Sequence, residues 1–166
     1  MAAFADHPGK TGLGGIMGNG YGIHGYDIYP GLSLKAGSLP VFWGFYGHIL
    51  PNSGGFALGV TGDYYIFEWD FITKTAVNDE GSYDINIHWY LGVGFFGDIY
   101  FWNNKDYLGL GGGIRIPFGV SWHATDTLEV AAGIAPGFGV YGHRGIDARF
   151  YYLIPPLELS VRHWWL

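Results

Sequence analysis

Cysteine is absent from the 166-residue chain, and charged side chains are scarce. Without cysteine the protein forms no disulfide bond, no thiolate metal site and no cysteine nucleophile. Lys, Arg, Asp and Glu make up 13% of the residues, against roughly 25% in an average soluble domain. A surface with so few charges is poorly hydrated. The composition therefore favours contact with lipid, or an unusually dry assembly, over an ordinary water-facing exterior.

Basic residues are especially few. With 8 Lys and Arg against 14 Asp and Glu, the formal net charge is −6. The chain has no basic stripe that could displace counterions from phosphates, which excludes nucleic acid as a partner. Intrinsic disorder is excluded by the opposite feature, because 49% of the residues are hydrophobic and 19% are aromatic.

Long hydrophobic runs are missing as well. A membrane-spanning helix needs about 20 consecutive apolar residues, and Gly, Asp, His or Asn interrupts every candidate stretch. Many of the 30 glycines lie inside the apolar segments, where each would cost a helix about 1 kcal/mol relative to alanine. The sequence therefore predicts strands and no helical span.

The chain does have a period-two alternation of side chains, the pattern of a strand whose two faces differ. In the clearest case, apolar residues from Ile85 to Phe95 alternate with Asn86, His88 and glycines. Five segments follow this rule, namely 56–66, 85–95, 108–121, 128–135 and 157–165.

Turn-forming residues separate the segments, as in a meander of antiparallel strands. Two further runs, about 11–22 and 31–48, give seven, and a change of phase near 37–40 suggests a bulge. Single-chain bacterial barrels have even strand numbers. Because 143–165 is long and contains Pro155-Pro156, we divide it in two. The prediction is an all-β, antiparallel, up-and-down barrel of about eight strands over residues 10–165.

Alternation alone does not distinguish a soluble, lipocalin-like barrel from a transmembrane one. The face opposite the apolar one carries mainly Gly, Ala, Ser, Asn and Tyr, with too few charges to cover a water-soluble barrel. Such residues suit the crowded interior of a small barrel. We therefore predict a transmembrane barrel with its apolar face outward.

Ionic residues on the inner face are the main candidate site. Both signs occur, and about eight strands enclose a space that side chains fill. We expect these groups to pair and close the lumen, although a narrow pore lined by Arg115 and Arg162 is the alternative. The predicted ion-pair network comprises Lys35, Asp63, Arg115, Glu129, Glu158 and Arg162, with Asn86 and His88 as polar lumen residues.

Tryptophans near segment ends are candidates for the aromatic girdles of a membrane interface. Packing in the core of a soluble protein is the alternative. Trp89 lies in the middle of a segment and does not fit a girdle. The predicted interface aromatics are Trp43, Trp102, Trp122, Trp164 and Trp165.

Other candidate sites carry little chemistry. The seven histidines lack metal-ligand spacing, so neither a metal nor a cofactor is expected. Ser121, His123 and Asp126 could suggest a hydrolase, but they lie beside a turn, and we predict no catalytic centre. Two polar segments, about 70–83 and 21–30, are predicted to be loops, where an extracellular ligand could bind or the chain is simply a solvated connection.

The chain resembles small bacterial outer-membrane barrels of the OmpA, OmpX and OmpW type, and in pattern especially uncharacterised small barrels of spirochaetes. The likeness covers most of 10–165 and rests on 30–35, 39–44, 127–130 with 135–137, and 159–165. It implies an outer-membrane location, lipid of that membrane as a partner, and a structural or surface-adhesive role through loops. A lipid-modifying enzyme ranks lower, because the His-x-Ser order of such barrels is reversed here, and so does a self-associating soluble β-barrel.

Both ends of the sequence fit this resemblance. Outer-membrane barrels commonly end in an aromatic residue preceded by alternate apolar residues, which the barrel-assembly machinery reads. Trp165 matches, except that His163 interrupts the pattern, and Leu166 is interpreted as an added residue. Ala3-Phe4-Ala5 has the A-x-A form of a signal-peptide cleavage site. Residues 1–9 are therefore expected to be an N-terminal segment that begins with an added initiator Met and retains part of a signal-peptide cleavage site.

Overall fold

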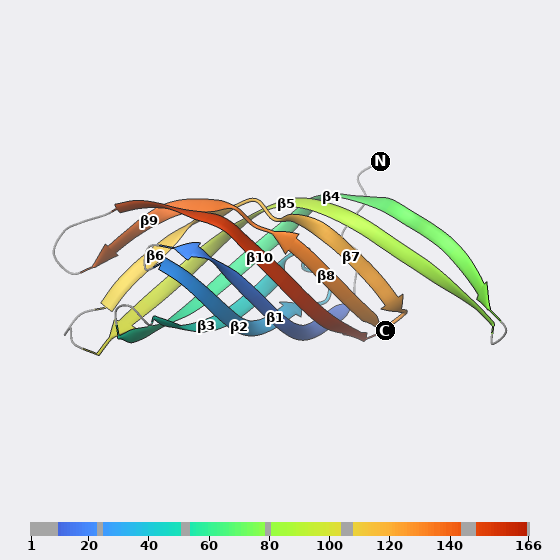
Figure 1. Cartoon of the computed structure of the whole chain (residues 1–166), viewed down its shortest axis with the longest axis horizontal. Helices are drawn as coiled ribbons and strands as arrows, with labels where there is room; N and C mark the ends of the chain where they lie inside the picture. The colour runs from blue at the N-terminus through green and yellow to red at the C-terminus, as the bar shows by residue number, and fades with distance from the viewer. Residues whose placement is uncertain are drawn as a thin grey trace.

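The computed structural model describes residues 10–22, 25–50, 54–78, 81–103, 108–143 and 149–165. Residues 1–9 and Leu166, with the expectations attached to them, lie outside this range. The described chain forms one closed antiparallel sheet (Figure 1), and it contains no helix long and apolar enough to cross a membrane. Its strand segments are β1 (Thr11–Gly22), β2 (Gly25–Lys35), β3 (Phe42–Leu50), β4 (Gly55–Asn78), β5 (Gly81–Trp102), β6 (Leu108–Arg115), β7 (Phe118–Thr125), β8 (Leu128–Ile134), β9 (Gly137–His143) and β10 (Arg149–Trp165).

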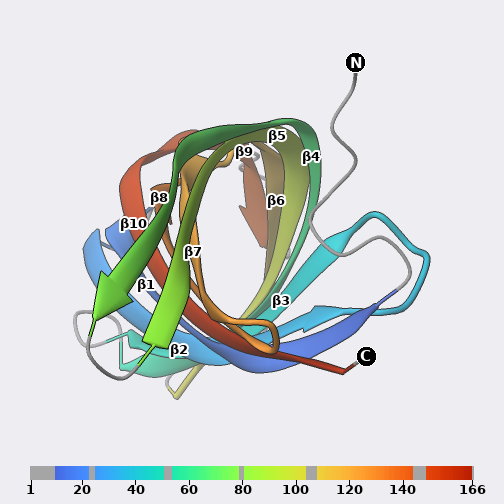
Figure 2. The ribbon, with the colours of Figure 1, turned by 90° about the vertical axis from the view of Figure 1, so that its right-hand side faces the viewer.

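These ten segments make eight barrel strands, because two strands are interrupted. β6 and β7 both pair with β5, one after the other, and are halves of one strand. β8 and β9 are related in the same way along β10. Pro117 and Pro136 lie at the two breaks, where proline removes a ladder donor, and the Ile116 N–H donates to the Pro136 carbonyl at 2.9 Å. Pairing of β1 with β10 closes the barrel, as the view in Figure 2 shows.

The prediction of an antiparallel barrel of about eight strands is confirmed, but the predicted division of the chain was wrong. The run 31–48 holds parts of two strands, β2 and β3, whereas β10 continues through Pro155-Pro156 as one strand. The change of phase near 37–40 marks the turn between β2 and β3. Gly37 adopts a φ of 48° in that turn, a left-handed conformation that favours glycine.

The two segments predicted as loops are largely strand. β4 has 24 residues and β5 has 22, so their hairpin includes nearly all of 70–83. β1 and β2 likewise leave only 23–24 between them. Polarity misled the sequence reading at 72–77, because threonine, valine and isoleucine favour strands and every residue there has a cross-strand partner on β5.

Apolar side chains point outward all around the barrel. Leu110 of β6, Ile116 between β6 and β7, and Val161 of β10 are 60%, 49% and 49% exposed, whereas Lys35 and Arg162 are buried inside. A soluble barrel would show the reverse arrangement. The predicted orientation of the two faces is confirmed, and this exterior is suited to hydrocarbon.

Inward-facing glycines make room for rings in the lumen. A Cβ added at Gly133 would lie 2.5 Å from the Tyr90 hydroxyl oxygen and 2.7 Å from the Phe118 carbonyl oxygen, whereas one added at Gly15 would meet nothing within 4 Å. We therefore expect Gly133→Val to lower the free energy of unfolding by about 1–3 kcal/mol and Gly15→Val to change it less. Urea unfolding in lipid vesicles measures both, and equal losses would contradict the assignment of faces.

Candidate functional site

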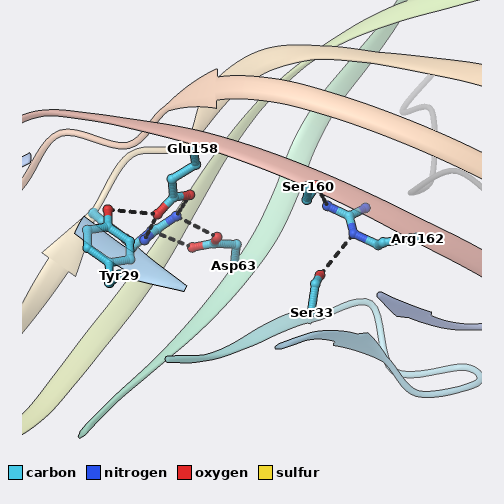
Figure 3. A network of polar contacts seen from close by, with 7 residues as sticks. Tyr29, Ser33, Asp63, Glu158, Ser160 and Arg162 are labelled. Atoms are coloured by element: carbon cyan, nitrogen blue, oxygen red, sulfur yellow. Dashed lines mark hydrogen bonds and ion pairs between the residues drawn. The ribbon is translucent and has the colours of Figure 1, made fainter. Parts of the chain in front are cut away.

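The first cluster of the barrel interior is centred on Arg115, which binds two carboxylates. Its Nη2 donates to Asp63 Oδ2 at 3.0 Å, and its Nε lies 3.0 Å from Asp63 Oδ1. On the other side Nη1 donates to Glu158 Oε1 at 2.8 Å and Nη2 donates to Glu158 Oε2. The Tyr29 hydroxyl reaches Glu158 at 3.5 Å, and Figure 3 shows Tyr29, Asp63 and Glu158 converging from different strands. We call these four residues the Arg115 cluster.

The strand register explains why the Arg115 cluster forms. Asp63 lies opposite Gly94, and Gly94 lies opposite Arg115 on the next strand. Cross-strand partners share a face of the sheet, so the acid and the base point into the lumen on either side of a glycine. A Cβ at position 94 would collide with Asp63 Oδ1. Gly94 therefore leaves the space in which the carboxylate and the guanidinium meet.

A second cluster surrounds Arg162 and lies beside Ser33 and Ser160 in Figure 3. Arg162 lies directly opposite Glu129 in the β10–β8 ladder, and its Nη1 donates to both Glu129 oxygens at 2.9 and 3.0 Å. Its Nε donates to Ser33 Oγ at 2.9 Å and its Nη2 to Ser160 Oγ at 3.2 Å. The indole N–H of Trp164 donates to Glu129 Oε2 at 2.9 Å. This Arg162 cluster thus has a neutral ion pair whose polar atoms are bound on several sides.

Aromatic rings fill the lumen around the Arg162 cluster. Phe42 stacks on Tyr65 and Tyr65 stacks on Tyr90, with ring centroids 4.4 Å apart in each pair. The Arg162 guanidinium lies 4.6 Å from the centroid of the Phe42 ring, a cation–π arrangement. The space between the strands is therefore occupied by packed side chains.

Asp98 organises the lumen further toward the β5–β6 connection, and the sequence analysis missed it. The Tyr46 hydroxyl donates to Asp98 Oδ1 at 2.8 Å, and the Tyr100 hydroxyl lies 3.5 Å from Oδ2. Trp102 and Tyr141 pack against Tyr100. The sequence could have identified Asp98 as a lumen residue. The even-numbered residues of 85–95 face inward, and position 98 is the next but one even position after that segment.

The remaining predicted lumen residues lie toward the ends of strands. Lys35 is buried and its Nζ donates to the carbonyls of Lys10 at 3.2 Å and Gly37 at 2.8 Å, so these contacts tie the β2–β3 turn to the start of β1. His88 Nδ1 lies 2.8 Å from Asp70 Oδ1. Asn86 is half-buried on the same strand. The structure thus groups five of the six ionic residues into two clusters. Lys35 adjoins the Arg162 cluster, with its Nζ 5.8 Å from the ring centroid of Trp164.

Two of the five predicted interface tryptophans were assigned to the wrong face. Trp102 and Trp164 are 7% and 0% exposed, inside the barrel, because each has the parity of the inward residues of its strand. Trp122 and Trp165 are outward, at 45% and 48% exposed. Trp43 is half-buried against Phe95, with ring centroids 5.7 Å apart.

Trp89, which the sequence analysis excluded from a girdle, faces outward beside other exposed tryptophans. Its exposed ring packs on Trp69, the residue opposite it on β4, with ring centroids 5.3 Å apart. Trp122 lies one strand away, opposite Ile87, and Trp165 ends β10 opposite Thr11. These outward tryptophans lie toward the end of the barrel where β10 stops, and we call Trp69, Trp89, Trp122 and Trp165 the tryptophan belt.

A small cavity adjoins the two arginine clusters. It is large enough for about one water molecule and is lined by rings and by Ser33, Thr61, Asp63, Glu158, Ser160 and Arg162. Ser121 is buried and faces the lumen. Among the described residues no group of three His, Cys, Asp or Glu side chains could hold a metal ion.

This chain is similar to solved structures in its fold and not in its sequence. No family model matches the sequence, and neither does any curated protein. The N-terminal β-barrel domain of Pseudomonas aeruginosa OprF is 12% identical, with 96% of this chain and 100% of that chain covered and a TM-score of 0.56. Neisserial surface protein A is 12% identical, with 93% and 95% covered and a TM-score of 0.52. The chain therefore has the fold of small outer-membrane β-barrels.

Proposed function

We propose that the protein is a bacterial outer-membrane barrel with a closed lumen, which acts as a structural and surface-interaction protein through parts that project from the membrane. The observation that supports this proposal most strongly is the filling of the lumen. Two arginine clusters and stacked rings occupy it, and every ionic group of the clusters is held by hydrogen bonds. The apolar exterior and the fold support the membrane location.

Three further features belong to the same proposal. The outer-membrane lipid would contact the exposed apolar side chains. The barrel-assembly machinery would bind β10, in which exposed residues alternate with less exposed ones from Leu157 to Trp165. Extracellular ligands would bind at the connections opposite the chain ends, which lie outside the described residues. A signal peptide and a closer relationship to spirochaete barrels remain predictions.

Conductance tests the closed lumen. We expect the purified barrel in planar lipid bilayers to give no discrete channels, because the arginine clusters and the ring stack obstruct the axis. An established porin reconstituted in parallel serves as the control for detection, and the heat-dependent shift of the barrel on gels verifies that it is folded. Stable channels of the wild-type protein would contradict the closed lumen.

A narrow pore is the second candidate, favoured by the polar cavity beside the clusters. Arg115 neutralises only one of its two carboxylates, so an open lumen would carry a negative surplus. Channels that prefer cations and change selectivity in an Arg115→Met variant would support this alternative. A conductance that is the same in both proteins would place the ion path elsewhere.

A further inference from the structure

The hairpin of β4 and β5 extends beyond the other strands at one end of the barrel, as Figure 1 shows in green. That end also holds both ends of the described chain, because β10 finishes at Trp165 opposite Thr11 at the start of β1. The turns after β2 and after β7 lie at the same end, since consecutive barrel strands run in opposite directions. The hairpin therefore projects on the side of the termini.

The projecting part begins at the tryptophan belt. Trp69 lies opposite Trp89, and the ladder continues from there to Asn78 opposite Gly81. From Trp89 to Gly81 the strand covers about 26 Å at roughly 3.3 Å per residue. Since tryptophans mark the boundary between hydrocarbon and water, this length of hairpin stands in the aqueous compartment. We call residues 72–87 the ribbon.

The side on which the ribbon stands follows from how a barrel inserts. Hairpins crossing a membrane need not carry a chain end across, so both ends of a barrel with an even strand number remain on the side of entry. For an outer-membrane barrel that side is the periplasm, and this step rests on the proposed location. The long β4–β5 hairpin would then be periplasmic, where barrels of this kind usually have short turns.

Both edges of the ribbon lack a neighbouring strand among the described residues, the β5 edge over Gly81–Ile85 and the β4 edge over a longer stretch. Within the described chain β4 pairs with β3 only through Gly55–Asp63, so the edge away from β5 has no neighbouring strand from Tyr64 to Asn78. Register shifts between Tyr65 and Phe67 and between Asp70 and Ile72 interrupt the first part, and bulges of this kind protect an edge from pairing. From Ile72 to Asn78 the register is regular, which leaves about seven residues able to accept a strand.

Charge indicates which strand would fit. The sequence of the ribbon contains Lys74 as the single base, against the acids Asp79, Glu80 and Asp84, a net charge of −2 from 1 − 3. Two ribbons side by side would repel each other, which disfavours a second copy of this chain. A basic segment would be attracted.

We propose that the open edge of Ile72–Asn78 binds an extended basic segment of a periplasmic protein as an added strand. Main-chain hydrogen bonds supply the affinity in this mode of recognition, and side-chain complementarity supplies the specificity. The ribbon then connects the membrane-embedded barrel to a soluble partner in the compartment of the chain ends.

The location of the ribbon is tested by single-cysteine labelling, for which the absence of native cysteine gives a clean background. Thr75 is exposed on the ribbon and Asn103 is exposed at the opposite end of the barrel. In intact cells a membrane-impermeant maleimide should label Asn103→Cys and leave Thr75→Cys unlabelled, and both should react after the outer membrane is permeabilised. Labelling of Thr75→Cys alone would overturn the periplasmic assignment, and labelling of neither site after permeabilisation would overturn the outer-membrane location itself.

Strand addition is tested with fluorescent hexapeptides and the barrel in detergent micelles. Lys-Val-Lys-Val-Lys-Val should bind at least tenfold more tightly than Glu-Val-Glu-Val-Glu-Val and should lose binding when alternate backbone nitrogens are methylated. The control is a variant in which an Asn-Gly turn joins Ile72 directly to Ile87, positions that are paired in the ladder. That variant should keep its folded gel shift and lose peptide binding.

The outcomes separate this proposal from the proposed function. Equal binding of both peptides, binding that survives methylation, or binding that survives removal of the ribbon overturns strand addition and leaves the location intact. A dimer of the wild-type protein that disappears with the ribbon would assign the edge to a second copy and overturn the proposal as stated.

Discussion

Replacing Arg115 with methionine is expected to lower the free energy of unfolding by about 3–5 kcal/mol, the cost of leaving buried charges without their partner. Asp63 and Glu158 both bind this guanidinium, and both would face each other across the space that it vacates. Methionine fills a similar volume, so the loss reports charge and not a cavity. Urea unfolding in lipid vesicles, followed by tryptophan fluorescence, measures the change.

The control is the triple variant Arg115→Met, Asp63→Asn and Glu158→Gln. Because a buried ion pair replaced as a unit is often close to neutral in stability, this protein should recover most of the loss. Arg115→Lys should fall between the two, since an ammonium cannot bind both carboxylates in the paired geometry of a guanidinium. A triple variant as unstable as the single one would show that the Arg115 cluster is not held by charge pairing.

The orientation of the barrel could be predicted from the sequence because it depends on parity alone. In a strand, every second residue shares a face, so the alternation from Ile85 to Phe95 shows which residues face outward once the exterior is known to be apolar. The low fraction of charged residues indicates that the exterior is apolar. The same parity places Arg115, Glu129 and Arg162 inside, and no knowledge of their partners is needed for that step.

Partners within the lumen could not be predicted, because they depend on the stagger between strands. Glu129 lies directly opposite Arg162, whereas Asp63 reaches Arg115 across an intervening strand, over Gly94. One residue of slip in a ladder would reassign the pair that depends on that ladder. A single sequence shows alternation along each strand, but it does not show the stagger.

The predicted positions of the tryptophans were partly wrong for a related reason. Position near a segment end was given more weight than parity for Trp102 and Trp164, although both have the parity of their inward neighbours. Trp89 was excluded because it lies in the middle of the segment 85–95. The strand β5 extends from Gly81 to Trp102 and continues past the tryptophan belt at its start. The height of a tryptophan along the barrel axis depends on both strand length and strand tilt, and the alternation of the sequence gives neither.

A charge placed on the outer face should distinguish lipid from water around the barrel. Leu159 is exposed in the interior of β10, opposite Met17 and Ala132, and lies six residues before Trp165 in the tryptophan belt, as 165 − 159 = 6. Leu159→Arg is expected to cost about 2–4 kcal/mol in a bilayer, the penalty for arginine near the midplane of a transmembrane barrel. Unfolding in vesicles of fixed composition gives the value.

Trp122→Arg is the matched control, because it changes an equally exposed side chain at the belt, where arginine costs only about 0–1 kcal/mol. The ratio of the two losses in unfolding free energy therefore reports how deep each residue lies in the bilayer. Such a dependence on depth is expected only if hydrocarbon surrounds the barrel. If water surrounded it, arginine at position 159 would be solvated and the two substitutions would cost about the same. Equal losses would contradict a lipid-facing exterior, while a graded loss would support the tryptophan belt as the boundary from which the ribbon projects.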